Sequence, residues 1–259
     1  VDNRFVNTTL SLIGSTSMPA TGTVVRGNVL RQQANPGNGE AITLRHHDAP
    51  VVAGNDLAGF QGGLRLFGGG ASAQVTGNTI DVDGIGLSLV DCDSPSSNPG
   101  LAANNRIISA NDTGLNVFEC VNQHVFHNSV SVAPTDSLRA TEFALVVGGV
   151  TASGATGTRV ANNILVTTGS AALRVDAPTG LTLEHNALFA NGRWGGVIRY
   201  DDVFYPSLQD YQNATGQGTG SVYANPRYVS NTDLTPRSTF VDDEGTDLTA
   251  FVATDANGT

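Results

Sequence analysis

The sequence contains no lysine, and this absence limits the partners that the protein can have. All 13 of its basic side chains are arginine, against 23 Asp and Glu, which gives the 259-residue chain a formal net charge of -10. The arginines are not gathered into a basic cluster. Because nucleic acids and anionic membrane surfaces attract clustered Lys and Arg, this acidic composition predicts that neither is a partner.

Long apolar runs and cysteines are also scarce. No run approaches the roughly 18 apolar residues of a membrane-spanning helix, so we predict no membrane span. The chain begins at Val1 without the charged and apolar regions of a signal peptide, which indicates a mature chain or an excised piece. Its two cysteines, Cys92 and Cys120, are too few for a disulfide framework. The apolar fraction of 39% and the length allow one sizeable core.

Asparagine recurs every 23 to 35 residues through the first 190 residues of the chain. The recurring residues are Asn28, Asn55, Asn78, Asn105, Asn128, Asn163 and Asn186. Apolar residues flank them, as in Val75-x-x-Asn78-x-Ile80, which is strand alternation broken by a bend. A second alternating run follows each bend after about ten residues, as in Leu87-x-Leu89. Each repeat therefore reads as strand, bend, strand and variable loop.

Such a short unit cannot bury its apolar face alone. Stacked on copies of itself, it can pair every strand with the same strand one coil away, at about 4.8 Å. The sequence therefore predicts an all-β protein, a parallel β-helix of about eight coils over residues 1–204. Leucine-rich repeats have a similar period but need a leucine consensus that is not visible here. The repeated asparagines are interpreted as structural, with their amides hydrogen-bonded in a ladder along the stack.

Two similar phrases support this register. Residues 86–92 read G-L-S-L-V-D-C and residues 114–120 read G-L-N-V-F-E-C. We interpret them as the same strand on consecutive coils, which places Cys92 on Cys120. The pair is close enough for a disulfide, and a buried pair of thiols is the equal alternative.

The run of Gly-Asn and Asn-Asn bends with apolar alternation resembles the right-handed parallel β-helix superfamily. That superfamily includes pectate-lyase-like and other polysaccharide-active proteins of bacteria. The resemblance covers about residues 1–204. It implies a right-handed helix, a polysaccharide as substrate or ligand, and a site along one outer face, often with Ca²⁺.

The repeat stops near Tyr205, and residues 205–259 read as a C-terminal capping segment. A short helix is predicted near residues 207–215, with Ser207 as its N-cap and Gly216 as its stop. The open end of a solenoid exposes apolar side chains and unpaired strand edges, which such a helix would cover.

Two parts of this segment, residues 207–217 and 221–229, resemble the C-terminal region of many secreted bacterial β-helix proteins. The resemblance implies that the protein is secreted or displayed on a bacterial cell surface.

The residues that follow the second strand of each repeat form an acidic edge. They are His46, His47, Asp48, Asp91, Asp93, Glu119, Asp176, Asp201 and Asp202. Stacked carboxylates repel one another unless a cation, an arginine or a raised pKa relieves them. Ca²⁺ would be held by Asp91, Asp93 and Glu119. Neighbouring arginines could neutralise the edge instead, and a solvated charged face is the plainer interpretation. Residues 81–84 and 242–245 are weaker calcium candidates.

A catalytic site would draw on the same edge. The candidates are Asp91, Glu119, Asp176, Arg65 and Arg174. Substrate-binding candidates are Asp201, Asp202, Arg199 and His46. Lyases of the resembled fold use Lys or Arg as the base, and only arginine is present. The motif of its hydrolases is matched only by residues 231–233, which lie in the tail.

The sequence thus supports two hypotheses about function. The first is a scaffold that presents a rigid face for glycan binding or for assembly with other subunits. The alternative is a polysaccharide lyase or glycoside hydrolase, with Ca²⁺ as its one candidate cofactor. Self-association, or membership of a longer parent chain, would suit a stacked solenoid in either case.

Overall fold

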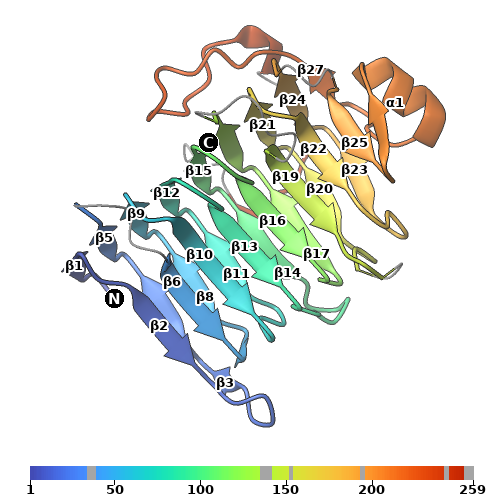
Figure 1. Ribbon diagram of the computed structural model, residues 1–259. Helices are drawn as coiled ribbons and strands as arrows, with labels where there is room; N and C mark the ends of the chain where they lie inside the picture. Colours follow the sequence, from blue (N-terminus) through green and yellow to red (C-terminus); the bar gives the residue numbers. More distant parts are fainter. Residues whose placement is uncertain (34–38, 135–141, 152–153, 193–195, 242–244, 254–259) are drawn as a thin grey trace.

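The computed structural model (Figure 1) describes all residues except 34–38, 135–141, 152–153, 193–195, 242–244 and 254–259. The chain forms a parallel β-solenoid, as the repeat predicts. Each coil contributes one strand to each of three sheets, which we call the first, second and third sheet in the order in which a coil visits them.

The first sheet comprises β1 (Arg4–Val6), β5 (Val29–Arg31), β9 (Asp56–Ala58), β12 (Thr79–Val82), β15 (Arg106–Ser109), β18 (Ser129–Val132), β21 (Ile164–Thr167), β24 (Ala187–Ala190) and β27 (Val222–Tyr223). The second comprises β2 (Leu10–Ile13), β6 (Glu40–Arg45), β10 (Gly62–Phe67), β13 (Leu87–Val90), β16 (Leu115–Phe118), β19 (Phe143–Gly148), β22 (Ala171–Val175), β25 (Ile198–Tyr200) and β26 (Val203–Tyr205). The third comprises β4 (Val24–Arg26), β8 (Val51–Ala53), β11 (Gln74–Thr76), β14 (Gly100–Ala103), β17 (Gln123–Phe126), β20 (Arg159–Ala161) and β23 (Thr182–Glu184). A small extra pair joins β3 (Ala20–Thr21) to β7 (His47–Asp48).

The solenoid has about seven turns, fewer than the predicted eight. Seven passes supply all three sheets, whereas the eighth supplies β24 and β25 and then turns back in β26, which is antiparallel to β25. Asp201 and Asp202 make this reversal, with φ angles of 49° and 63° in the left-handed region. The eighth pass therefore adds no strand to the third sheet, where Thr219 makes only an isolated bridge to Glu184 of β23.

The predicted asparagine ladder is confirmed. In the middle of the stack, the backbone N–H and Nδ2 of Asn78 both donate to Oδ1 of Asn105, at 3.0 and 2.9 Å. The ladder asparagines from Asn28 to Asn186 are at most 3% exposed. The ladder also extends further than the sequence predicts, since Asn3 donates to Asn28 and Asn186 donates to the Ser221 hydroxyl.

The residue before each ladder asparagine makes the bend. It is Gly, Asn or His in the seven predicted repeats, and its φ lies between 50° and 65°. Only glycine adopts this conformation without cost, and asparagine and histidine tolerate it better than most residues. This explains the Gly-Asn, Asn-Asn and His-Asn dipeptides of the sequence.

The core is a set of apolar side chains stacked coil on coil. Leu87 pairs in register with Leu115, as predicted, and Leu115 pairs with Leu145 of β19. All three are fully buried. The sequence analysis does not identify β19, because its six residues are all buried and so show no alternation.

A helix covers the C-terminal end of the solenoid (Figure 1). It is α1 (Leu208–Thr215), with the predicted caps: the Ser207 hydroxyl accepts the Asp210 N–H, and Gly216 has a φ of 68°. The buried Tyr211 ring packs against the ring of Tyr200 on β25, with the two ring centres 5.4 Å apart. The chain then returns to the stack as β27 and ends in a short 3₁₀ helix, η1 (Thr239–Val241), and an irregular segment.

Among the described residues, no helix is both long and apolar enough to span a membrane.

Candidate functional site

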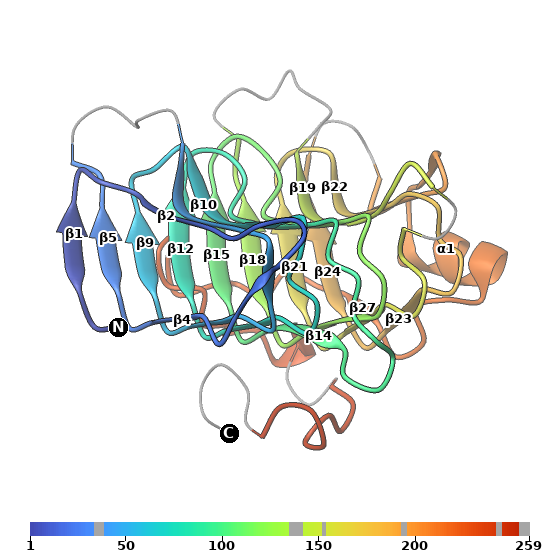
Figure 2. The same ribbon diagram turned by 90° about the horizontal axis from the view of Figure 1, so that it is seen from below.

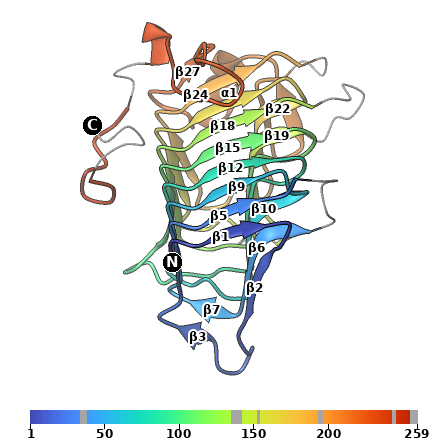
Figure 3. The same ribbon diagram turned by 90° about the vertical axis from the view of Figure 1, so that its left-hand side faces the viewer.

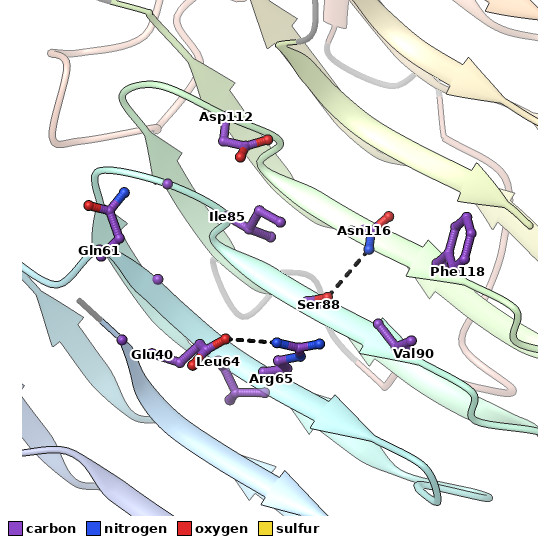
Figure 4. Close-up of a pocket in the computed structure, with 13 residues that line it drawn as sticks. Glu40, Gln61, Leu64, Arg65, Ile85, Ser88, Val90, Asp112, Asn116 and Phe118 are labelled. Atoms are coloured by element: carbon purple, nitrogen blue, oxygen red, sulfur yellow. Dashed lines mark hydrogen bonds and ion pairs between the residues drawn. The ribbon is translucent and has the colours of Figure 1, made fainter.

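A groove lies on the outer face of the second sheet, over four successive coils (Figure 4). Its volume is about 530 Å³. It is lined by Gly39, Glu40, Gln61, Gly62, Leu64, Arg65, Gly84, Ile85, Ser88, Val90, Asp112, Asn116 and Phe118.

Strand register brings the side chains of this groove together. Arg65, Ser88 and Asn116 occupy paired positions on β10, β13 and β16, and Val90 pairs with Phe118 two residues along. Because the leucines between them face the core, the alternation of a strand sends all five outward. The result is a row of polar groups running across the strands, one per coil at about 4.8 Å, beside a row of apolar ones.

The polar groups of the groove are partly engaged with one another. Arg65 forms an ion pair with Glu40 at 3.1 Å, and Asn116 Nδ2 donates to the Ser88 hydroxyl at 3.3 Å (Figure 4). The guanidinium of Arg65 also lies over the ring of Phe67, at 5.4 Å from its centre. Both partners of the ion pair are more than a third exposed, so solvent screens it and it adds little stability.

One buried donor in the groove is not satisfied. Arg65 Nε is shielded from solvent and has no hydrogen-bond partner among the described residues. Unsatisfied buried polar groups are rare and call for an explanation, and a bound ligand is one. With two carboxylates, Glu40 and Asp112, and one guanidinium, the groove is suited to hydroxyl-rich ligands that accept and donate hydrogen bonds.

The predicted calcium ligands do come together, at a different place. Asp91, Asp93 and Glu119 line a separate cavity of about 220 Å³ just beyond the ends of β13 and β16. The Glu119 carboxylate, however, already accepts hydrogen bonds from the Val150 N–H at 2.6 Å and from both the N–H and the hydroxyl of Thr151. These bonds, with the Thr151 hydroxyl first, lower the pKa of Glu119.

Glu119 therefore holds Val150 and Thr151 in place after β19, and a side chain at Gly149 would displace its carboxyl group. Asp93 similarly accepts the Val121 N–H at 3.1 Å. Among the described residues, no three His, Cys, Asp or Glu side chains are arranged to hold a metal ion. The side-chain geometry thus gives no support to calcium at this edge.

Two of the other acidic candidates are neutralised by arginine. Arg174 makes a two-point contact with Asp176, its two nitrogens lying 2.7 and 3.1 Å from the two carboxylate oxygens. Arg199 pairs with Asp202 at 2.5 Å. Asp176, Arg174, Asp201, Asp202 and Arg199 all lie outside the groove lining, so Arg65 is the one predicted catalytic candidate that the groove contains.

The adjacent histidines serve different coils. Nδ1 of His46 lies 2.5 Å from the Gly68 carbonyl oxygen, and Nδ1 of the buried His47 lies 2.8 Å from the Thr23 hydroxyl. The two rings therefore contact different neighbours. Neither lines the groove.

The weaker calcium candidates are also accounted for in part. Asp81 lies on β12 with its carboxyl half-buried, and burial raises its pKa, an effect that Arg31 opposes and Asp56 reinforces. Residues 242–244 of the second candidate lie outside the described residues.

Cys92 and Cys120 form a disulfide in the structure, with their Cα atoms 4.7 Å apart. Both are buried, and they follow Asp91 and Glu119 directly. The bond joins the two consecutive coils that carry β13 and β16.

Sequence reasoning missed most of the groove. It aligned the residues that follow the second strand of each repeat, whereas the groove is built from outward positions within those strands and from the turns before them. The signal was present in the alternation, because Ser88, Asn116 and Phe118 stand between core leucines and valines. Gln61 and Asp112 lie in turns and have no periodic signal.

Comparison with known proteins assigns no family: no family model matches the chain, and no curated protein matches it.

Proposed function

We propose that the protein is a β-helical scaffold that binds a glycan along the groove of the second sheet. The observation that carries the proposal is the lining of the groove, in which a row of polar groups runs beside an apolar surface over four coils. Sugar rings present the same combination, with hydroxyl groups around the rim and C–H groups on the faces.

The spacing of the groove favours an extended chain over a compact ligand. Arg65, Ser88 and Asn116 repeat at the strand spacing of about 4.8 Å, which is close to the advance of one sugar ring in an extended polysaccharide. Phe118 supplies a face on which a ring can stack, and the partly exposed guanidinium of Arg65 supplies hydrogen-bond donors. The rigid stack holds these groups in place before the ligand arrives, which lowers the entropy cost of binding.

The experiment is a calorimetric screen of the purified chain against plant, algal and bacterial polysaccharides, with and without Ca²⁺. Arg65→Gln and Phe118→Ala should each weaken binding of any hit about tenfold, because central anchors carry most of the binding free energy. Arg159→Gln is a matched control, since Arg159 also combines an ion pair with a contact to an aromatic ring, on the third sheet. No hit in the panel, or a hit that Arg159→Gln weakens equally, would contradict the proposal.

We also propose a polysaccharide lyase as the second candidate, because Arg65, a candidate base, lines the groove beside Glu40 (Figure 4). The two carboxylates of the groove, Glu40 and Asp112, do not form a hydrolase pair, because they belong to coils three steps of about 4.8 Å apart, whereas such a pair is about 5–9.5 Å apart. The same panel should then yield unsaturated products, and Arg65→Gln should slow their formation by a factor of about 100 or more. Saturated reducing ends would instead indicate a hydrolase. Binding without product leaves the scaffold.

The proposed place of action is outside the cytoplasm, at the surface of a bacterial cell or in its surroundings. The disulfide between Cys92 and Cys120 supports this, since disulfides persist in oxidising compartments. Alkylation of the protein taken from its native source, without reduction, tests the point. Two free thiols per chain would contradict it.

A further inference from the structure

The outer face of the third sheet differs from that of the second because the chain's own tail covers it. Figures 2 and 3 show the segment near the C-terminus lying outside the stack, away from the first and second sheets. Leu248 of this segment is 2% exposed and packs with Ala103, Phe126 and Ala161, which pair in register on β14, β17 and β20. Leu101 and Val252 complete the cluster. The name apolar strip is used below for the outward residues of the third sheet at this place, which are Leu101, Ala103, His124, Phe126 and Ala161.

The shape of the strip suits one large side chain. Phe126 stands between two alanines of neighbouring coils, so a leucine can lie beside its ring without displacing anything. A second anchor, Phe251, meets the edge of His124 at 4.9 Å and lies 5.7 Å from Phe126. The strip therefore takes a leucine and an aromatic residue three positions further along.

The tail backbone is recognised separately from its side chains. The amide of Asn162 donates to the Thr246 carbonyl at 2.7 Å and accepts the Thr246 N–H at 2.9 Å. This two-point contact reads a peptide unit, as a neighbouring strand would. Asn162 stands at the left-handed bend of its coil, so its side chain is free of the ladder that Asn163 serves. A side chain at Gly245 would come within 3.2 Å of that amide.

The tail carries its own preorganisation. Asp247 accepts hydrogen bonds from the N–H and the hydroxyl of Thr249, and the N–H groups of Phe251 and Val252 both donate to the Leu248 carbonyl. This turn holds the apolar anchors on one side, so a short peptide of the same sequence can adopt the bound shape at low entropy cost. All of the tail contacts described above come from residues 246–252, so a short peptide contains every group that the third sheet contacts.

We propose that the apolar strip is a peptide-binding site, and that a second copy of this chain can fill it with its own residues 245–252. The ligand is a short segment that presents a peptide unit to Asn162, a leucine to Phe126 and, after a turn, an aromatic residue to His124. The exchange pairs two copies through their tails and leaves the groove of each second sheet open. It is independent of the glycan proposal.

The first test uses the full chain with Leu248→Asp and Phe251→Asp, which unseat its tail. A labelled peptide of residues 245–253 should bind this variant saturably, with a dissociation constant on the order of 0.1 mM. The wild-type chain should bind the peptide at least tenfold more weakly, because its own tail competes. The peptide with Ala250→Ser, a change at an exposed position, should bind like the native peptide, and the peptide with Leu248→Asp should not bind.

The second test asks for the pair of chains directly. The tail variant keeps its strip, whereas a Phe126→Ala chain keeps its tail and loses the main contact of the strip. Each alone should sediment as a monomer, and their mixture should form a one-to-one complex at about 0.1 mM. A mixture that stays monomeric, or equal binding of the native and Leu248→Asp peptides, would overturn the proposal. Thermal melting of each variant checks that it is folded.

Discussion

The outer faces of the second and third sheets follow the same alternation, yet they present opposite chemistry. On the second sheet the outward positions hold Arg65, Ser88 and Asn116 and form an open groove. On the third sheet the outward positions that the tail covers hold Ala103, Phe126 and Ala161. The difference shows that the inward side chains of each strand stabilise the solenoid, whereas the outward side chains can differ from one sheet to another.

A substitution in the ladder should destabilise the second and third sheets together, and it is expected to have the largest effect on the free energy of unfolding. Asn105→Ala removes the acceptor of two Asn78 donors and a donor to both Val75 and Asn128, all in a fully buried place. We expect the free energy of unfolding to fall by about 4 kcal/mol, because unsatisfied buried donors each cost roughly 1–3 kcal/mol. Urea unfolding measures the change.

Asn213→Ala is the matched control, since Asn213 is exposed on α1 and should change stability by less than about 0.5 kcal/mol. If the two variants unfolded at the same urea concentration, the ladder would not support the stack.

Loss of the disulfide should weaken the face that carries the groove. Removing it with Cys92→Ala and Cys120→Ala opens a loop closed over 28 residues, which should lower the free energy of unfolding by about 3 kcal/mol. Wild-type protein unfolded in the presence of a reductant should behave alike. Because the bond joins the coils of β13 and β16, hydrogen exchange should quicken in those strands before it does in β20 and β23. An equal increase of the hydrogen-exchange rate in all of these strands would mean that the disulfide does not stabilise its two coils locally.

A crossed pair of substitutions sharpens the comparison between the faces. Phe118→Ala should weaken glycan binding about tenfold and leave the tail in place, whereas Phe126→Ala should release the tail and leave glycan binding unchanged. Hydrogen exchange of the Phe251 and Val252 amides reports on the tail, because both donate to the Leu248 carbonyl when it is docked. A variant that altered both readouts would show that the faces are coupled through the core.

Acidification should weaken the docking of the tail on the third sheet, with the smallest effect. Burial, and then the neighbouring Arg159, lower the pKa of His124. The docked tail therefore favours neutral His124, and uncovering His124 removes part of that burial, so that it takes up a proton more readily. Docking should be strongest above about pH 6.5 and should weaken a few-fold as the pH falls towards 5.

The charged groups around His124 bear on this expectation. Arg159 faces His124 from β20 and is itself paired with Glu184 of β23, and the tail contributes Asp247, whose pKa is lowered by its bonds to Thr249. The Asp247 carboxylate therefore stays charged over the range of interest. His124→Gln should remove the pH dependence of peptide affinity, and an unchanged dependence in that variant would assign it to another group.

The repeat was predictable because it is periodic. The solenoid, the ladder from Asn28 to Asn186 and the helix after Ser207 all follow from spacing and capping residues that one sequence displays. The strand β19 was missed because an entirely buried strand has no alternation to read. The last coil is incomplete because the chain reverses at Asp201 and Asp202. In the sequence these two aspartates look the same as the exposed aspartates of the acidic edge, so the reversal was not predicted.

The candidate sites were less predictable, for a physical reason. The acidic edge was visible because the carboxylates recur, but its meaning depends on partners far along the chain, such as Thr151 beside Glu119. The groove depends on turns that hold Gln61 and Asp112, and turns carry no period. The tail contact joins Asn162 to Thr246, which are 84 positions apart. No local sequence pattern predicts a contact over that separation.

The ladder gives this molecule a unit of construction. Each ladder asparagine from Asn3 to Asn163 donates the same two hydrogen bonds to the next, always towards the C-terminus. The chain between two ladder positions is therefore a repeating unit that can be exchanged for another. Duplicating a unit such as residues 78–104 would lengthen the stack without creating an unmatched donor. Growth by such duplications would extend a groove in steps of one coil, and would vary its reach while its chemistry stayed the same.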